Sequence, residues 1–214
     1  KRHLLRTIVE NIDMNNDVVT KTNGEPVSVY DFGLLLYFSL SVFDKPFEKV
    51  SFNEVRFSTT QTKKKYIGLY KQDSGELKDI NNDLAKDFSV SLYNCIYGSE
   101  IKNNMWSEVI KSLEVDINFG DLGLSKLMTV TQEEFTHEST EVFKSLSSGH
   151  AAVIYYITHV IELIENKTIC IFDEPENHLH PPLLSAFIRT LSEVLKINNG
   201  MAVIATHSPV VLQE

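Results

Sequence analysis

The sequence predicts an α/β fold with a mainly parallel sheet flanked by helices and interrupted by a helical insertion. The stretches Thr168–Phe172 and Met201–Ala205 are short apolar runs, typical of strands buried on both faces of a parallel sheet. Between them, Pro181–Leu195 has apolar residues at helical spacing, so the order strand, helix, strand implies a parallel crossover. Each run ends in polar residues, Asp173-Glu174 and Thr206-His207, at the edge of an open α/β sheet where ligands bind.

The bulk composition is that of a soluble globular chain with one large or two small domains. Its 214 residues are 43% hydrophobic and carry a formal net charge of −9, so a nucleic-acid contact would need a local patch. Lys63-Lys64-Lys65 is one such patch, which we interpret as a solvated turn. Cys95 and Cys170 lie in apolar contexts and predict reduced core thiols of a cytoplasmic protein. No apolar run approaches the roughly 18–20 residues that span a membrane.

The N-terminal third predicts strands after a short helix. Lys1–Glu10 has the spacing of a helix end, and Leu34–Leu40 reads as a buried strand. Val55–Ser58 and Tyr66–Tyr70 bracket the lysines and predict a β-hairpin or two neighbouring strands.

Two amphipathic stretches predict a helical subdomain over residues 79–127. Apolar residues step along one face from Ile80 to Ile96 and again from Met105 to Leu113. The predicted division is therefore 1–78, 79–127 and 128–214. We predict no element over Thr129–Phe143. Ala151–Ile164 is apolar on nearly every face and predicts a buried helix.

Three groups of residues carry the chemistry. Asp173 and Glu174 lie at a strand end and can have two different roles: one carboxylate can hold a metal ion and the other can polarise a water. His207 follows the neighbouring strand, so we expect it close to these carboxylates. Ser147-Ser148-Gly149 precedes the buried helix, whose free N–H groups and dipole favour a phosphate. Together the three groups indicate nucleotide hydrolysis.

Each group alone has a structural interpretation. Asp-Glu-Pro also describes a cap and turn, and Ser-Ser-Gly before a helix is ordinary capping chemistry. His178 and His180 with His207 would suit zinc, but no cysteine or clear further ligand accompanies them.

The motifs resemble those of ABC-type ATPases. Leu146-Ser147-Ser148-Gly149-His150 is similar to the Leu-Ser-Gly-Gly-Gln signature, with Ser148 and His150 as departures. Ile169–Glu174 resembles the Walker B strand with its catalytic glutamate, Glu176–His180 the D-loop, and Thr206-His207 the switch histidine. Gln72, in Ile67–Gln72, more weakly resembles the Q-loop glutamine. In sequence, these motifs are most similar to those of AAA/ABC-type ATPases of bacterial antiphage defence, namely the OLD family and especially the Septu ATPase subunit. The Septu ATPase subunit is also found with some retrons. The likeness is strong over 145–214 and looser over 34–72.

This resemblance implies a P-loop NTPase fold, ATP and Mg²⁺ as cofactors, and a role for each matching residue. Asp173 would position Mg²⁺, Glu174 would be the general base, and His207 would touch the γ-phosphate. Gln72 would join the metal and the water. Ser147, Ser148 and Gly149 would bind the nucleotide of a partner protomer, and His180 would lie at that dimer seam. A Walker A loop (Gly-x-x-x-x-Gly-Lys-Ser/Thr) is absent. We expect it upstream of Lys1; alternatively, Lys1 is its altered remnant, with Arg2 in place of the metal-binding hydroxyl.

The function implied is a cytoplasmic ATPase subunit that dimerises, or forms a higher homo-oligomer, around ATP. It would hydrolyse ATP weakly or under regulation and control an HNH-type nuclease in antiphage defence. Nucleic acid, bound directly or through the complex, is a further expected partner, and a membrane is not. One rival is a RecF-like or SMC-like DNA-repair ATPase, although no coiled-coil heptads appear over 79–127. Another is a non-hydrolysing nucleotide-gated scaffold. An intact Glu174 argues against the scaffold, and an altered Walker A loop would favour it.

Overall fold

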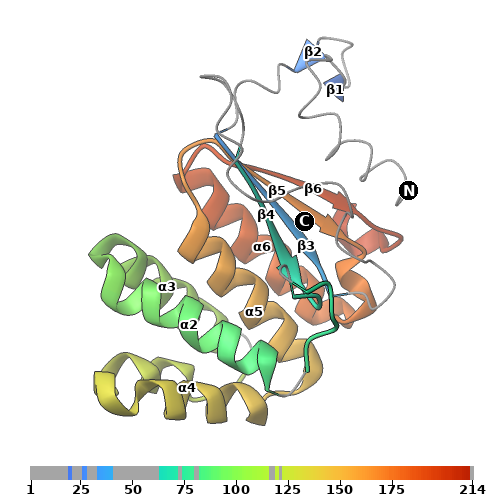
Figure 1. The fold of residues 1–214 in the computed structure, drawn as a ribbon. Helices are drawn as coiled ribbons and strands as arrows, with labels where there is room; N and C mark the ends of the chain where they lie inside the picture. The colour runs from blue at the N-terminus through green and yellow to red at the C-terminus, as the bar shows by residue number, and fades with distance from the viewer. Residues whose placement is uncertain are drawn as a thin grey trace.

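A four-stranded parallel sheet forms the centre of the molecule (Figure 1). The computed structural model describes residues 19–20, 26–27, 33–40, 63–71, 74–79, 82–115, 119–120 and 122–212. The strand order is β4-β3-β5-β6, with strands β3 (Leu34–Ser39), β4 (Lys63–Gly68), β5 (Thr168–Asp173) and β6 (Met201–Ala205). Two short strands, β1 (Val19–Thr20) and β2 (Pro26–Val27), pair antiparallel with each other. The parallel sheet with flanking helices confirms the predicted α/β fold.

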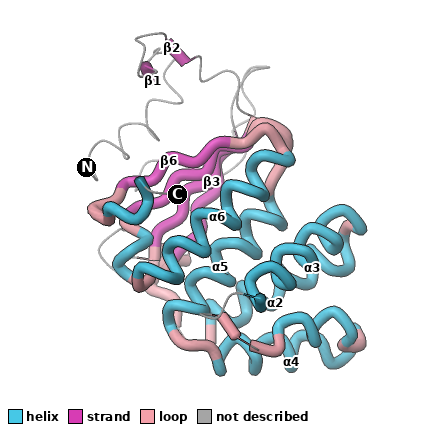
Figure 2. Tube along the Cα trace, turned by 180° about the vertical axis from the view of Figure 1, so that it is seen from behind, coloured by secondary structure: helices cyan, strands magenta, loops and turns pink. Residues whose placement is uncertain are grey.

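The helices form two successive layers beside the sheet. Helices α5 (Ser148–Leu163) and α6 (Pro181–Ile197) lie against the sheet and pack on each other (Figure 2). Helices α2 (Asp83–Gly98) and α3 (Glu100–Val115) pack on the outer side of α5, and α4 (Gln132–Ser145) packs on α2. Short 3₁₀ turns complete the chain: η2 (Leu124–Thr129), η3 (Pro175–Asn177) and η4 (Pro209–Leu212).

An aromatic cluster fixes the two central strands near their carboxyl ends. Phe38 of β3 stacks on Phe172 of β5, with ring centroids 4.5 Å apart. Tyr156 of α5 meets both rings edge-on, and Phe187 of α6 meets Phe172 edge-on at 5.2 Å. Truncation of such a buried ring costs about 3–5 kcal/mol. Because Phe172 directly precedes Asp173, this cluster also sets where the polar end of β5 lies.

The three lysines do not form the solvated turn that we expected. Lys63, Lys64 and Lys65 are the first half of β4 and pair in register with Leu34–Leu36 of β3. In the described sheet β4 is a terminal strand, where lysines keep their charges in water and discourage pairing with another chain. The strand predicted at Tyr66–Tyr70 therefore begins earlier, and it is parallel to β3. The predicted partner Val55–Ser58 lies outside the described residues.

The helical region contains one helix more than the sequence predicted. Helices α2 and α3 match the two amphipathic stretches, whereas α4 covers much of the segment left without an element. Of its side chains only Phe135, Ser139 and Phe143 are buried, a narrow stripe at four-residue spacing. The Ser139 hydroxyl donates to Ser89 Oγ of α2 at 2.7 Å. The division at residues 79 and 127 stays a prediction.

Helices α2 and α3 meet α5 through a polar seam inside the hydrophobic core. Trp106 Nε1 donates to Thr158 Oγ1 at 3.1 Å, and both residues are fully buried. His159 Nδ1 lies 2.8 Å from the Tyr155 carbonyl oxygen, and burial lowers the pKa of its ring. Cys95, also in this seam, is a free thiol whose pKa burial raises to about 12. Cys170, in β5, is also a free thiol whose pKa burial raises to about 12, so both cysteines are core thiols as predicted.

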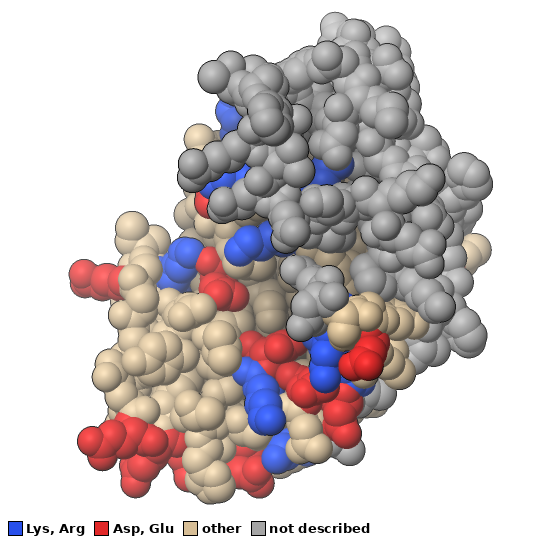
Figure 3. Space-filling view, viewed as in Figure 1, with Lys and Arg blue, Asp and Glu red and all other residues tan. Residues whose placement is uncertain are grey.

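The surface of the helical end is acidic. Figure 3 shows Asp and Glu side chains gathered around the end of the molecule where α4 lies. Glu133, Glu134, Glu138 and Glu141 of α4 are all exposed. Such a surface repels phosphate backbones, so α4 is a poor place for nucleic acid to bind. None of the helices in the described parts of the chain is long and apolar enough to cross a membrane.

Candidate functional site

The predicted site residues after β5 and β6 lie together at the carboxyl edge of the sheet. Strands β5 and β6 pair in register up to Asp173 and Ala205. The main-chain N–H of Glu174 then donates to the Ala205 carbonyl oxygen at 2.8 Å, which continues the pairing by one residue. Glu174 and His207 therefore leave the sheet side by side, because parallel neighbours end at the same edge.

Glu174 and His207 are in direct contact. Glu174 Oε1 lies 3.3 Å from His207 Nε2, and Asn177 Nδ2 donates to Glu174 Oε2 at 3.1 Å. The imidazole side chain is 68% exposed, whereas the carboxylate is only 17% exposed. A mostly shielded carboxylate beside an accessible imidazole can exchange protons with water or with a ligand that reaches the imidazole.

The backbone of Glu174 is left-handed, with φ 45° and ψ 55°. A non-glycine residue in this region carries strain of order 1–3 kcal/mol, and such residues collect at functional sites. Glu174 lies between Asp173, the last residue of β5, and Pro175, the first residue of η3, so the chain changes direction at this residue. This turn aims the Glu174 side chain along the edge of the sheet and not into the core.

Asp173 is the last residue of β5 and is 6% exposed. Tyr156 lies behind it in the core; burial raises the pKa of this phenol strongly, and the charge of Asp173 raises it further. Asp173 is thus a buried carboxylate at the carboxyl end of β5, next to a neutral phenol. An oxygen donor of this kind suits a hard divalent cation such as Mg²⁺.

The predicted anion-binding loop caps α5. Ser147 is the N-cap residue, and its Oγ accepts from the His150 main-chain N–H at 3.4 Å and lies 2.8 Å from His150 Nδ1. Ser147 and Ser148 are exposed, whereas Gly149 is buried. A Cβ on Gly149 would lie 2.9 Å from Leu183 Cδ1 and 3.3 Å from the His178 carbonyl oxygen. The loop is therefore packed directly against the segment that follows Glu174.

His178 and His180 are both exposed, but the ring of His178 is partly desolvated. Burial lowers the pKa of His178, and a hydrogen bond with the Leu40 backbone partly opposes this shift. His180 is exposed at the N-cap of α6, and its side chain makes no capping bond. Within the described residues, no three His, Cys, Asp or Glu side chains are grouped to hold a metal ion, so the zinc alternative finds no site there.

Gln72 and the Walker A candidates Lys1 and Arg2 lie outside the described residues. Lys71, directly before Gln72, and Lys78, further along the chain, are described and are tied to α2. Lys71 pairs with Asp83 at 3.3 Å, and Lys78 pairs with Asp87 at 2.6 Å and donates to the Gly68 carbonyl oxygen at 2.9 Å.

Sequence reasoning assigned no role to two residues of η3. Asn177 contacts Glu174, and Glu176 Oε1 accepts from Thr206 Oγ1 at 2.9 Å and from the main-chain N–H of His207. The available signal was their position directly after the acidic pair, within the segment that resembles a D-loop. Their partners could not be read from the sequence, because those partners depend on the register of β6.

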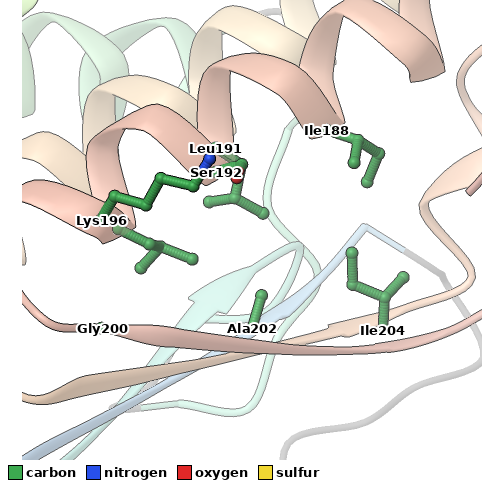
Figure 4. A pocket seen from close by; sticks show the side chains of 8 residues that line it. Ile188, Leu191, Ser192, Lys196, Gly200, Ala202 and Ile204 are labelled. Carbon is green, nitrogen blue, oxygen red and sulfur yellow. The ribbon is translucent and has the colours of Figure 1, made fainter. Parts of the chain in front are cut away.

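A shallow apolar hollow lies elsewhere, between α6 and the outer strand β6. Figure 4 shows Ile188 and Leu191 of α6 facing Ala202 and Ile204 of β6. None of its lining residues is a predicted site residue, so the hollow and the polar edge are separate features.

The fold and this edge define an AAA/ABC-type ATPase domain of the P-loop NTPase kind. The comparisons agree: the chain belongs to the family described as "AAA domain, putative AbiEii toxin, Type IV TA system", whose family model matches residues 33–213. The chain is also 42% identical, over 166 residues, to protein ea59 of Escherichia phage lambda. That match covers 70% of this chain and 31% of the phage protein, so the chain spans about a third of its relative. No solved structure matches the chain.

Proposed function

We propose that the chain is the ATP-binding and ATP-hydrolysing part of an ABC-type ATPase. Its substrate would be ATP with Mg²⁺, and its products ADP and phosphate. The observation that carries the proposal is the contact between Glu174 and His207 at the carboxyl edge, directly beside the buried carboxylate of Asp173.

The residues at this edge fit the chemistry that Mg²⁺-ATP requires. Asp173 supplies a hard oxygen donor, and the exposed residues Ser147 and Ser148 stand at the positive end of a 16-residue helix. Bound Mg²⁺ would neutralise charge that develops on the phosphate oxygens during hydrolysis. Asp173 and Gln72 would hold the ion.

Glu174 has the role of general base in this proposal. Asn177 and His207 each contact one of its two oxygens, so the carboxylate has a fixed direction and keeps lone pairs to accept a proton from water. His207 is the more exposed partner and would reach the γ-phosphate. The strained backbone of Glu174 keeps this geometry ready before the nucleotide arrives.

The exposed serines and His180 support a role for a second copy of the chain. Ser147, Ser148 and His180 are all exposed, and Gly149 packs against Leu183 and the His178 carbonyl oxygen in the segment that contains His180. In our proposal the three exposed residues contact ATP held by a partner protomer, so that ATP joins a homodimer or a higher homo-oligomer.

The biological setting that we propose is cytoplasmic antiphage defence of the OLD or Septu kind, with an HNH-type nuclease as the regulated partner. The support is indirect: the family description names a toxin of a toxin–antitoxin system, and a relative is encoded by a bacteriophage. Copurification of the full-length protein with the product of its neighbouring gene, with and without ATP, tests the partner.

The enzymatic proposal is tested with Glu174→Gln, compared with Glu138→Gln on the exposed face of α4 as a charge-matched control. Glu174→Gln should lower phosphate release about 10²–10⁴-fold, keep ATP binding, and trap an ATP-dependent dimer seen by light scattering. Glu138→Gln should behave like the parent protein. Unchanged phosphate release in Glu174→Gln would remove this residue from the role of base.

The family description supplies a second candidate, a toxin whose expression stops growth. Expression of the chain alone tests it. Growth arrest that persists in Glu174→Gln would favour a toxin that works independently of ATP hydrolysis.

A further inference from the structure

Glu176 joins the two loops that leave β5 and β6. It lies in the middle of η3, and its Oε1 accepts two hydrogen bonds from the other loop, from the Thr206 hydroxyl at 2.9 Å and from the His207 main-chain N–H. Thr206 Oγ1 in turn accepts from the Ser208 main-chain N–H at 2.9 Å. One carboxylate oxygen thus organises the backbone of residues 206–208.

This organisation decides where the imidazole of His207 lies. Its ring is largely exposed, and the loop leaves the sheet immediately before it. The bond from Glu174 N to Ala205 O fixes the chain only up to the end of β6. Beyond that point, Glu176 holds the backbone N–H of the residue that carries the ring.

The other oxygen of Glu176 shows that the arrangement has a cost. Oε2 is buried and has no hydrogen-bond partner among the described residues. A buried acceptor without a partner is unfavourable, and native proteins keep few of them. A carboxylate retained under this cost, two residues after the proposed base, is better explained by function than by stability.

We infer that Glu176 is a positioning residue, which acts through His207 by fixing the backbone of Thr206 and His207 so that the imidazole meets Glu174. The kinetic part of this inference rests on the proposed ATP hydrolysis, whereas the structural part does not.

Thr206 offers a matched pair of substitutions for the hydroxyl that Glu176 accepts. Thr206→Val keeps the shape and loses the donor, whereas Thr206→Ser keeps the donor. In the full-length protein, Thr206→Val should lower kcat about tenfold with KM within twofold, because a displaced catalytic group costs rate more than binding. Thr206→Ser should restore kcat to the parent value. Equal losses in both variants would contradict the inference.

The inference is tested directly by a cycle of Glu176→Ala, His207→Ala and the double variant. If Glu176 acts through His207, Glu176→Ala should lower kcat about tenfold to a hundredfold in the parent and have no further effect in the His207→Ala background. A role limited to holding the fold would lower the melting temperature in both backgrounds, and the two losses in kcat would multiply. That multiplication would overturn the inference.

A readout that needs no turnover separates this inference from the proposed function. The ring signal of His207, followed by NMR in histidine-labelled full-length protein and assigned with His207→Ala, should shift or broaden in Glu176→Ala. It should stay unchanged in Glu193→Gln, an exposed glutamate of α6. If the parent protein hydrolyses no ATP, the proposed function fails. The NMR signal of His207 still shows whether Glu176 positions its ring. An unchanged His207 signal in Glu176→Ala overturns the inference even in an active ATPase.

Discussion

The two edges of the sheet use the same backbone conformation for different purposes. Among the described residues other than glycine, a positive φ occurs at Lys167 and Asn199 on the amino edge and at Glu174 on the carboxyl edge. On the amino edge both side chains are exposed. At Lys167 the backbone makes the contacts: its N–H donates to the Asn198 carbonyl oxygen at 2.9 Å, and the Gly33 N–H donates to the Lys167 carbonyl oxygen at 3.2 Å. The exposed side chain of Asn199 donates from Nδ2 to Asn166 Oδ1 at 3.3 Å.

On the carboxyl edge the side chain makes the contacts. The carboxylate of Glu174 is mostly shielded and has a partner at each oxygen, Asn177 and His207. The amino edge uses the left-handed residue to reverse the chain, and the carboxyl edge uses it to aim a functional group. The same substitution to glycine should therefore relieve strain at both edges but lower turnover at the carboxyl edge alone.

The largest effect is expected from Glu174→Gly on the carboxyl edge. Glycine accepts a positive φ without strain, so the melting temperature should stay level or rise. Turnover should nevertheless fall about 10²–10⁴-fold, because the proposed base is lost. Thermal melts and phosphate release measured on the same preparation check both statements. A fall in melting temperature together with full turnover would reverse the interpretation of this edge.

The next effect is expected from His207→Ala. Loss of the ring removes the exposed partner of Glu174 and should lower kcat about tenfold to a hundredfold. His137→Ala on the exposed face of α4 is the matched control and should leave kcat unchanged. A purely structural His207 would instead lower the melting temperature and leave the rate per folded molecule intact.

A third substitution tests the packing under the carboxyl edge. Gly149→Ala places a Cβ 2.9 Å from Leu183 Cδ1, and Leu183 is fully buried, so the unfolding free energy should fall by about 1–3 kcal/mol. At Gly98, the last residue of α2, nothing lies within 4 Å of an added Cβ. Gly98→Ala should raise stability by about 0.5–1 kcal/mol. Denaturant unfolding of the pair measures both changes, and equal effects would argue against a tight contact at Gly149.

The smallest effect is expected from Lys167→Gly on the amino edge. Relief of the left-handed strain should raise stability by about 0.5–1 kcal/mol, reduced by the greater freedom of glycine in the unfolded chain. Turnover should not change, since the Lys167 side chain is exposed and remote from the proposed site. A loss of turnover would show that the two edges are coupled.

The elements that the sequence predicted correctly have an apolar pattern that is regular over their whole length, although β6 is only partly buried and not buried on both faces as expected. β5 and β6 are continuous apolar runs, and α5 is buried almost all round, so each pattern has one interpretation. Helix α4 was missed because it buries a single stripe through Phe135 and Phe143, and a serine interrupts that stripe. Lys63–Lys65 was taken for a turn because local charge was weighed above the backbone pairing with β3, which depends on residues far away in the chain.

The meeting of Glu174 and His207 could be expected from the sequence, because both follow neighbouring parallel strands. The contacts of Glu176 could not, since they depend on the register of β5 against β6 and on a 3₁₀ turn that no local pattern announces. The catalytic roles of Glu174 and His207 stay predictions until turnover is measured. Those of Gln72 and of the Walker A candidates fall on residues outside the described parts.

Helix α5 and strand β5 are consecutive and run in opposite directions, joined by residues 164–167. A helix of 16 residues spans about 24 Å and a strand of 6 residues about 20 Å. The strand therefore brings Asp173 back to the level of Ser147, where the helix begins. One residue inserted within α5 would swing its first turn round the axis by about 100°, and four would lengthen the helix by about 6 Å. The length of α5 should therefore tolerate far less change than its composition. Insertions within the helix should be harmful even where substitutions at the same positions are accepted.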